Sequence, residues 1–220
     1  QYSTTTTASS LEAWNKAYKG SGQVHEVCCY PRLPGLIDAH ARLIKAALDS
    51  AEGKVRVLFS AHGLPERVIK AGDPYQRQIE ATAAAIIARL DQPVDWQVCY
   101  QSRVGRLVWI GPSTPEAIEQ AARDEVGVVV LPIAFVSEHI ETLVELDHEY
   151  AELAENLGCA PYIRVPALGV DRAFIAALAD ITVAALDQPG VAPGAGWTCG
   201  ECGPICPARD RANSGGVAAA

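Results

Sequence analysis

The sequence predicts an α/β fold, namely a Rossmann-like four-stranded parallel sheet with helices on both faces. Short apolar, β-branched runs alternate along the chain with longer segments of helical periodicity. Alternation of this kind implies right-handed βαβ crossovers. Polar side chains follow two of the apolar runs directly, at the edge where open α/β sheets bind ligands. The predicted strands are 24–29, 55–59, 96–100 and 128–133, and the predicted helices are 36–50, 74–90, 115–124 and 140–157.

Local signals support these elements in chain order. Residues 54–59 read KVRVLF and residues 127–135 read GVVVLPIAF, which are the continuous apolar runs of buried inner strands. Asp73 is placed as a helix N-cap with Pro74 at the first helical position. Residues 160–166 are expected to form a further short extended piece that leads into a helix over 172–186.

His62 lies where the second predicted strand ends. The segment 58–65 reads LFSAHGLP, and its glycine and proline stop the strand just after the histidine. The carboxyl end of such a strand faces a cleft, where a neutral imidazole can accept a proton or bind a metal. The alternative is a histidine that only bonds a loop carbonyl.

An acidic segment follows the fourth predicted strand. Residues 136–150 read VSEHIETLVELDHEY, which includes Glu138 and His139. With a helix start near Ser137, the side chains of Glu141, Glu145 and His148 share one face. Like charges at this spacing repel by about 0.2–0.5 kcal/mol per pair, so the stripe favours a compensating cation. The alternative is a solvated helix face whose acids favour the helix dipole.

A third segment, 100–112, places aromatic and cationic side chains near a strand end. Tyr100 and Trp109 can stack beside a flat ring system, and Arg103 and Arg106 can pair with carboxylates. For Trp109, the alternative is a packed surface lid.

These three segments closely resemble the ferrochelatases, the enzymes that insert ferrous iron into a porphyrin. The resemblance rests on LFSAHGLPERVIKAGDPYQRQIEAT, YQSRVGRLVWIGPST and LPIAFVSEHIETLVELDHEY, and it extends from residue 1 to about residue 186. It implies a chelatase-like fold of two half-domains, with protoporphyrin IX and ferrous iron as substrates and two protons released. Another tetrapyrrole chelatase, acting with iron on coproporphyrin or with cobalt, is one alternative function, and an inactive metal- or cluster-binding module is another.

The resemblance also implies roles for individual residues. His62 and Glu141 jointly accept the pyrrole protons and contact the metal. Glu138, His139 and Glu145 form a proton or ion path that leads away from them. Tyr100, Arg103 and Trp109 line the porphyrin pocket.

The resemblance further implies a domain organisation. Residues 1–22 correspond to the end of the first half-domain, 23–170 to the second half-domain, 171–187 to a helix that packs toward the first half-domain, and 188–220 to a linker and tail. Because the chain contains no methionine, we expect that more sequence precedes it, including most of the first half-domain. An exposed apolar face is therefore expected on Phe174, Ile175, Leu178 and Ile181.

The tail carries a cysteine array. Residues 197–210, WTCGECGPICPARD, place Cys199, Cys202 and Cys206 in a C-x2-C-x3-C pattern that favours metal ligands over disulfides. Some ferrochelatases bind a [2Fe-2S] cluster with three such cysteines and one from upstream, so a cluster is expected here, with zinc as the alternative. Animal members place the fourth cysteine after a Tyr-Ser pair, where this chain has Thr4. The candidates for the fourth ligand are Cys28, Cys29, Cys99 and Cys159, of which the first two are preferred.

Charge restricts the partners. The net charge is −8, so no basic surface is available for nucleic acid. The sequence has no apolar run long enough to span a membrane, and it predicts a cytoplasmic protein. A homodimer and a peripheral contact with the inner membrane are left open.

Overall fold

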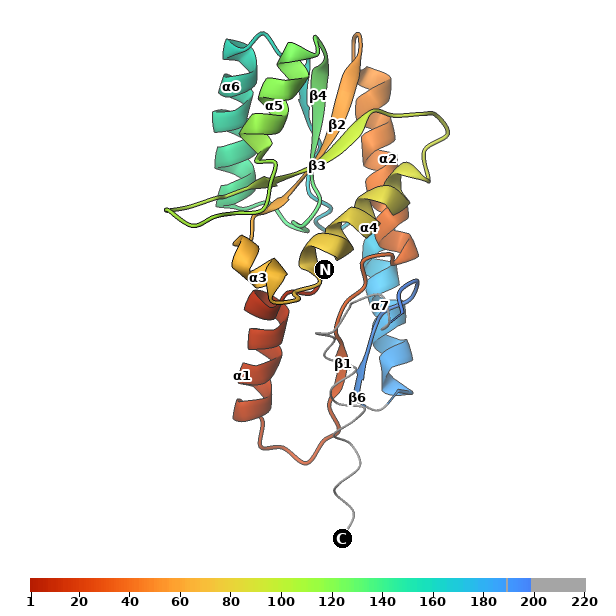
Figure 1. Ribbon diagram of the computed structural model, residues 1–220. Coiled ribbons are helices and arrows are strands. Elements are labelled where there is room, and N and C mark those ends of the chain that lie inside the picture. The colour runs from red at the N-terminus through yellow and green to blue at the C-terminus, as the bar shows by residue number, and fades with distance from the viewer. Residues whose placement is uncertain (189, 199–220) are drawn as a thin grey trace.

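The computed structural model describes residues 1–188 and 190–198. A four-stranded, all-parallel sheet forms its centre, with strand order β3-β2-β4-β5 (Figure 1). The central strands are β2 (Val55–His62), β3 (Trp96–Gln101), β4 (Gly127–Pro132) and β5 (Tyr162–Arg164). The predicted α/β class and parallel sheet are confirmed.

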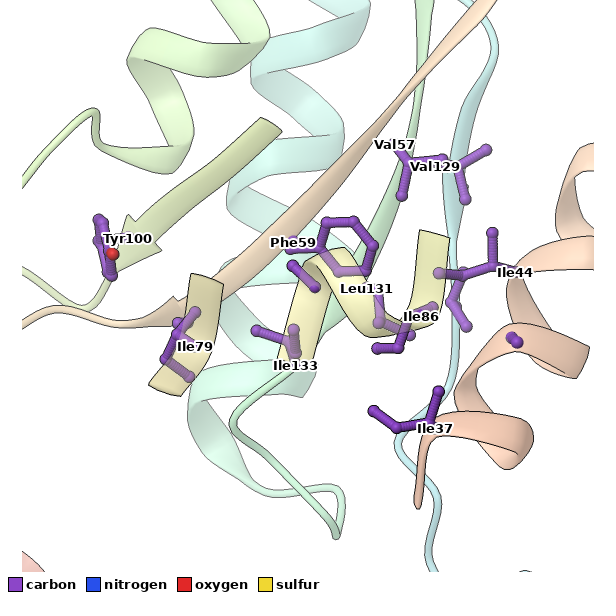
Figure 2. Close-up of a cluster of buried hydrophobic side chains, with 14 of the residues drawn as sticks. Ile37, Ile44, Val57, Phe59, Ile79, Ile86, Tyr100, Val129, Leu131 and Ile133 are labelled. Carbon is purple, nitrogen blue, oxygen red and sulfur yellow. The ribbon is translucent and has the colours of Figure 1, made fainter. Parts of the chain in front are cut away.

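Helices cover both faces of this sheet. The apolar residues of α2 (Pro34–Ser50) and α4 (Tyr75–Ile87) pack against one face, around Phe59 and Leu131 (Figure 2). On the other face, α5 (Thr114–Arg123) and α6 (Tyr150–Asn156) pack around Leu58 and Val130. Each inner strand is therefore buried on both sides, which explains its continuous apolar sequence.

Local signals account for the helix starts. Ser113 and Glu116 form a capping box at the start of α5, in which each side chain accepts a backbone N–H of the other residue. Asp171 caps α7 (Arg172–Leu186) by accepting two backbone N–H groups. Pro34 occupies the first turn of α2, where its missing N–H is not needed.

The remaining elements surround this core. They are η1 (Thr4–Ala8), α1 (Ser9–Ala17), β1 (His25–Val27), α3 (Glu66–Lys70), η2 (Glu141–Glu149) and β6 (Gly190–Ala192). The predicted helix over 140–157 is in fact two segments, because η2 has the wider hydrogen-bond pattern of a π-helix and only α6 is regular.

The prediction for the first strand was wrong. Residues 24–29 were expected in the central sheet, but β1 pairs with β6 in a separate two-stranded parallel sheet. The fourth central strand is β5, which lies within the extended piece expected at 160–166 and pairs with β4 from Val128 to Val130. The edge of β4 thus acquires its partner from a later segment of the chain.

The exposure predicted for the last helix was also partly wrong. Phe174 and Ile181 are buried in a cluster with α2 residues, because α7 crosses α2 closely at Gly35. Ile175 is 46% exposed, as expected, and Val183 and Leu186 are exposed as well.

Candidate active site

The site begins at the carboxyl end of the central sheet. His62 is the last residue of β2 and lies beside Gln101, the last residue of β3. The backbone carbonyl of His62 accepts a hydrogen bond from the Tyr75 hydroxyl, 3.1 Å away, and the next residue, Gly63, donates to the Gln101 carbonyl at 2.8 Å. The strand end is therefore held firmly, and the imidazole extends from a fixed backbone.

Glu141 faces His62 from the start of η2. The Nδ1 atom of His62 lies 3.0 Å from Oε2 of Glu141, within hydrogen-bond distance. Both side chains are partly open to solvent, with exposed fractions of 41% for His62 and 34% for Glu141. The two residues singled out from the sequence are thus brought together, and their free atoms can receive a proton or an ion from outside.

Aromatic groups flank this pair. The ring of Phe135 lies edge-on to the His62 ring, with centroids 6.4 Å apart, and it also contacts the ring of His139 at 4.9 Å. Nδ1 of His139 accepts the backbone N–H of Glu141 at 3.2 Å. His139 therefore helps to fix the first turn of η2.

Glu145 lies one turn further along η2. Its Oε2 atom accepts hydrogen bonds from the Gln101 side chain, from the backbone and hydroxyl of Ser102, and from the Tyr150 hydroxyl. Gln101 also donates to the backbone carbonyl of Glu141 at 2.9 Å. Glu145 is thus tied to the same strand end as His62, whereas His148 is exposed.

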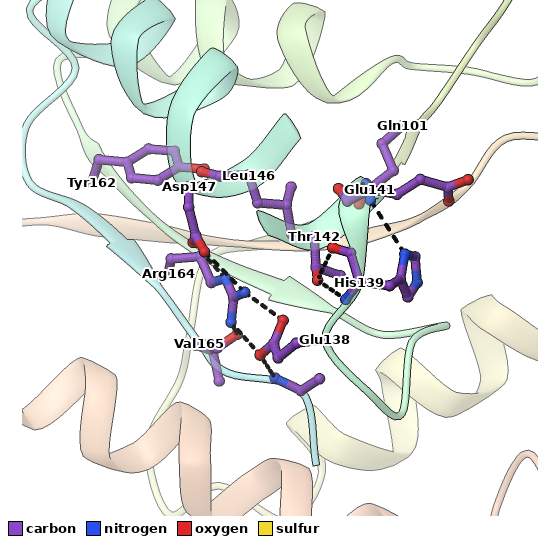
Figure 3. Close-up of polar contacts among 11 residues, drawn as sticks. Gln101, Glu138, His139, Glu141, Thr142, Leu146, Asp147, Tyr162, Arg164 and Val165 are labelled. Carbon is purple, nitrogen blue, oxygen red and sulfur yellow. Dashed lines mark hydrogen bonds and ion pairs between the residues drawn. The ribbon is translucent and has the colours of Figure 1, made fainter. Parts of the chain in front are cut away.

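Glu138 has a different set of partners (Figure 3). Its carboxylate binds the Arg164 guanidinium at 2.5 and 2.7 Å and accepts the backbone N–H of Ala167 at 2.7 Å. Burial opposes ionisation of Glu138, but hydrogen bonds from Arg164, Thr142 and Ala167 outweigh it and lower its pKa to about 2. Arg164 also pairs with Asp147. The structure therefore places Glu138 in an ion-pair network on β5.

The predicted pocket residues lie around one cavity of about 360 Å³. Tyr100, Arg103 and Trp109 all line it, together with Gln101, Ser102 and Tyr150. Tyr100 is only 1% exposed and belongs to the apolar core, so its ring is covered by protein. Arg103 is exposed and pairs with Glu116 at 3.4 Å.

Sequence reasoning missed several residues of this site. Gln101, Ser60 and Thr114 are fully buried polar residues joined by hydrogen bonds of 2.8 Å. Gln101 directly follows a predicted strand, which is the same position that singled out His62. That signal was therefore available. Arg164 and Phe135 carry no comparable local signal.

The cysteines fall into two groups. Cys99 and Cys159 are buried in the core between the central sheet and α5 and α6, and burial raises the pKa of the Cys99 thiol to about 12. Cys28 and Cys29 lie in a separate cluster with Tyr2 and Trp197. Cys199, Cys202 and Cys206 lie outside the described residues. Within residues 1–188 and 190–198, no group of three or more potential metal ligands occurs.

Comparison with known proteins gives a family. The family model described as Ferrochelatase matches residues 1–186. The chain belongs to the ferrochelatase family. It is 58% identical over 221 residues to a ferrochelatase of Caulobacter vibrioides, an alignment that covers 97% of this chain and 63% of the relative. It is 52% identical to a ferrochelatase of Phenylobacterium zucineum, with 99% and 63% covered.

This chain is shorter than the ferrochelatases to which it is similar. The chain spans about 63% of the length of these curated relatives. A ferrochelatase of Hyphomonas neptunium is 53% identical over a shorter alignment, which covers 84% of this chain. Among the described residues, no helix is both long and apolar enough to cross a membrane.

Proposed function

We propose that this chain carries the metal-handling wall of an enzyme that inserts ferrous iron into protoporphyrin IX. The observation that supports this most directly is the contact of His62 Nδ1 with Glu141 Oε2 at the strand ends of a ferrochelatase-family chain. Insertion replaces two pyrrole N–H protons with one Fe²⁺ ion, so two protons must leave. An imidazole and a carboxylate in contact at a partly exposed strand end can accept protons and can also bind the incoming ion.

The surroundings of the pair suit this role. Phe135 provides an apolar wall beside both histidines, and a nearby apolar surface favours a flat, poorly hydrated macrocycle. Arg103, at the rim of the neighbouring pocket, offers a planar set of donors that suits a propionate carboxylate. His62 and Glu141 then act from one side of the macrocycle, and binding a bent porphyrin better than a flat one would accelerate insertion.

The test compares variants of the complete gene product. Replacement of His62 by alanine and of Glu141 by glutamine should each lower the rate of metal insertion by at least about a hundredfold, the usual contribution of a positioned acid or base. His148→Ala is the matched control, because His148 is exposed on the same helix as Glu141. Zinc insertion into a soluble porphyrin, followed by fluorescence, measures the rate. Near-normal turnover of His62→Ala in a folded protein would remove His62 from the chemistry.

We also propose that the tail cysteines bind a [2Fe-2S] cluster with Cys28 or Cys29 as the fourth ligand. Such a cluster needs four ligands, and Cys199, Cys202 and Cys206 supply three thiols. Trp197, two residues before Cys199, is 5% exposed and packs in one cluster with Cys28 and Cys29. The last described part of the chain before the array therefore lies beside these two thiols, which supports them as candidates.

The other cysteine candidates have less support. Cys99 and Cys159 lie in the second core cluster, where their thiols donate to the carbonyls of Phe59 and Val126. Thr4, which occupies the place of the animal ligand, donates to Asp73 at 2.6 Å. The Sγ atoms of Cys28 and Cys29 lie 3.8 Å apart, so either could serve.

Visible absorption and iron-to-sulphide analysis of anaerobically prepared protein test the cluster. One of the two variants Cys28→Ser and Cys29→Ser should lose the visible absorption of the cluster, and the other should keep it. Cys159→Ser is the control. Loss of the cluster only in Cys159→Ser would show that the chosen ligand is wrong. Colourless protein with tightly bound zinc would favour the alternative metal.

A further inference from the structure

The carboxylate of Glu145 concentrates its contacts on one oxygen. Oε2 accepts the Gln101 side-chain N–H at 3.1 Å, the Ser102 N–H and hydroxyl at 3.0 Å each, and the Tyr150 hydroxyl at 3.1 Å. Oε1 has no hydrogen bond within the part of the chain that the structure describes. Two of the four donors are amide N–H groups, which do not pass protons onward. This arrangement suits an anchor better than a step in a proton relay.

Gln101 extends the anchor to the catalytic pair. Its side chain is fully buried, and its oxygen accepts the Ser60 hydroxyl at 2.8 Å. Its nitrogen donates both to Glu145 Oε2, at 3.1 Å, and to the backbone carbonyl of Glu141, at 2.9 Å. One buried amide therefore connects the end of β3 to the first turn of η2. A buried amide with all these partners in place has one favoured orientation.

Ser102 opens the segment that carries the predicted pocket residues. Its φ of 58° lies in the left-handed region, which is rare for residues other than glycine and persists only when the surroundings hold it. Both the N–H and the hydroxyl of Ser102 bind Glu145. The far end of the segment is fixed by Ile110, whose N–H donates to Leu64, two residues after His62.

We propose that Glu145 and Gln101 are positioning residues that latch segment 102–109 to η2. The latch keeps Arg103 and Trp109 at the pocket and keeps Glu141 opposite His62. This inference rests on the proposed function for its catalytic consequence, but its structural part stands independently. It also replaces the relay role expected for Glu145 from the sequence.

The test exploits the difference between an anchor and a relay. Glu145→Gln keeps an oxygen that can accept the donors, whereas Glu145→Ala removes it. In hydrogen exchange of the complete gene product, Glu145→Ala should speed exchange of the Ser102 and Ile110 amides, which are hydrogen-bonded at the two ends of the segment, by about tenfold or more, and Glu145→Gln should stay near wild type. Glu149→Ala is the control, because Glu149 is exposed on the same helix. Tyr150→Phe removes one donor only, so it should give a smaller increase and serves if Glu145→Ala does not fold.

Steady-state kinetics give the second readout. Glu145→Ala should raise the porphyrin KM by about tenfold with a smaller change in kcat, and Glu145→Gln should restore both. If Glu145 instead passed protons, Glu145→Ala and Glu145→Gln should lose kcat equally while hydrogen exchange stayed unchanged. That result would overturn the proposal. Unchanged exchange in both Glu145→Ala and Tyr150→Phe would overturn it as well. If the wild-type protein inserted no metal, the proposed function would fail while hydrogen exchange still decided the latch.

Discussion

At the scale of single residues, Glu138 and Glu141 are three positions apart but meet opposite kinds of partner. Glu138 is neutralised by Arg164, whereas Glu141 faces a histidine, and both side chains of that pair are partly exposed to solvent. A carboxylate bound to a guanidinium is a poor proton acceptor, since its ionised form is the stabilised one. Under the proposed function, proton acceptance is therefore expected at Glu141, whereas Glu138 is held in the ion pair with Arg164 on β5.

The Glu138 ion pair predicts a defined pH dependence of stability. Because its pKa is lowered from 4.5 to about 2, its stabilising contribution is fully present above pH 4.5 and is lost as the pH falls toward 2. The pair is partly exposed, so Glu138→Gln should lower the free energy of unfolding by only about 1 kcal/mol at neutral pH. Urea unfolding of both proteins at pH 7 and pH 3 measures this. A difference that persists unchanged at pH 3 would contradict it.

His40 predicts a second pH effect, of larger size. It is completely buried in α2, and neither ring nitrogen has a hydrogen-bond partner among the described residues. Burial lowers its pKa from 6.5 to about 4, although Asp171 opposes the shift. Below pH 6.5 the His40 imidazole binds a proton in the unfolded chain but stays neutral in the folded chain. The free energy of unfolding therefore falls as the pH drops toward 4, by about 3 kcal/mol at most.

His40→Leu should remove this loss. The substitution deletes two unpartnered polar atoms and keeps an apolar contact, so we expect no large loss of stability at pH 7. The free energy of unfolding, followed from pH 7 to pH 4.5 in urea, should depend less steeply on pH in the variant. His148→Leu, at an exposed position of η2, is the control. Identical slopes for wild type and His40→Leu would rule out this origin of acid sensitivity.

At the scale of elements, the close approach of α2 and α7 sets a steric limit. A Cβ atom at Gly35 would lie 2.5 Å from Ala177 Cβ and 2.6 Å from the Ala173 carbonyl oxygen. Alanine normally favours a helix over glycine by about 1 kcal/mol, but overpacking costs about 1–3 kcal/mol. Gly35→Ala should therefore destabilise the protein, as measured by thermal or urea unfolding. Gly111→Ala, where the nearest atom is 3.9 Å away, is the control, and equal effects would refute the steric argument.

The elements also show what the sequence could predict. β2 and β4 were recognisable because inner parallel strands are apolar throughout, and His62 because it follows such a run. β1 was misplaced because a three-residue strand has no local signature, and its partner β6 lies more than 160 residues later. The pairing of Glu138 with Arg164 could not be predicted either, because the two residues are 26 positions apart and no local pattern connects them. Helical periodicity identified the region of η2 but not its π hydrogen bonds, which shift side chains around the helix.

At the scale of the whole molecule, the described chain has one well-covered sheet and one that is barely formed. The central sheet is packed by helices on both faces. The β1–β6 sheet has only two strands, of three residues each. An independently stable sheet usually needs at least about three strands. Apolar side chains of α7, such as Val183 and Leu186, remain exposed nearby. The curated relatives are longer than this chain, which spans about 63% of their length.

This asymmetry predicts how the chain behaves alone. Because His62 and Glu141 belong to the well-packed half, the chain should fold its central sheet and keep their contact. A porphyrin needs a second wall for tight binding, so metal insertion by the isolated chain should be at least about a hundredfold slower than by the complete gene product. Circular dichroism checks the fold, and zinc-porphyrin fluorescence checks the rate. Comparable turnover by the two proteins would contradict this prediction. It would mean that the residues present in this chain suffice to bind the porphyrin, because an incomplete pocket could not support that rate.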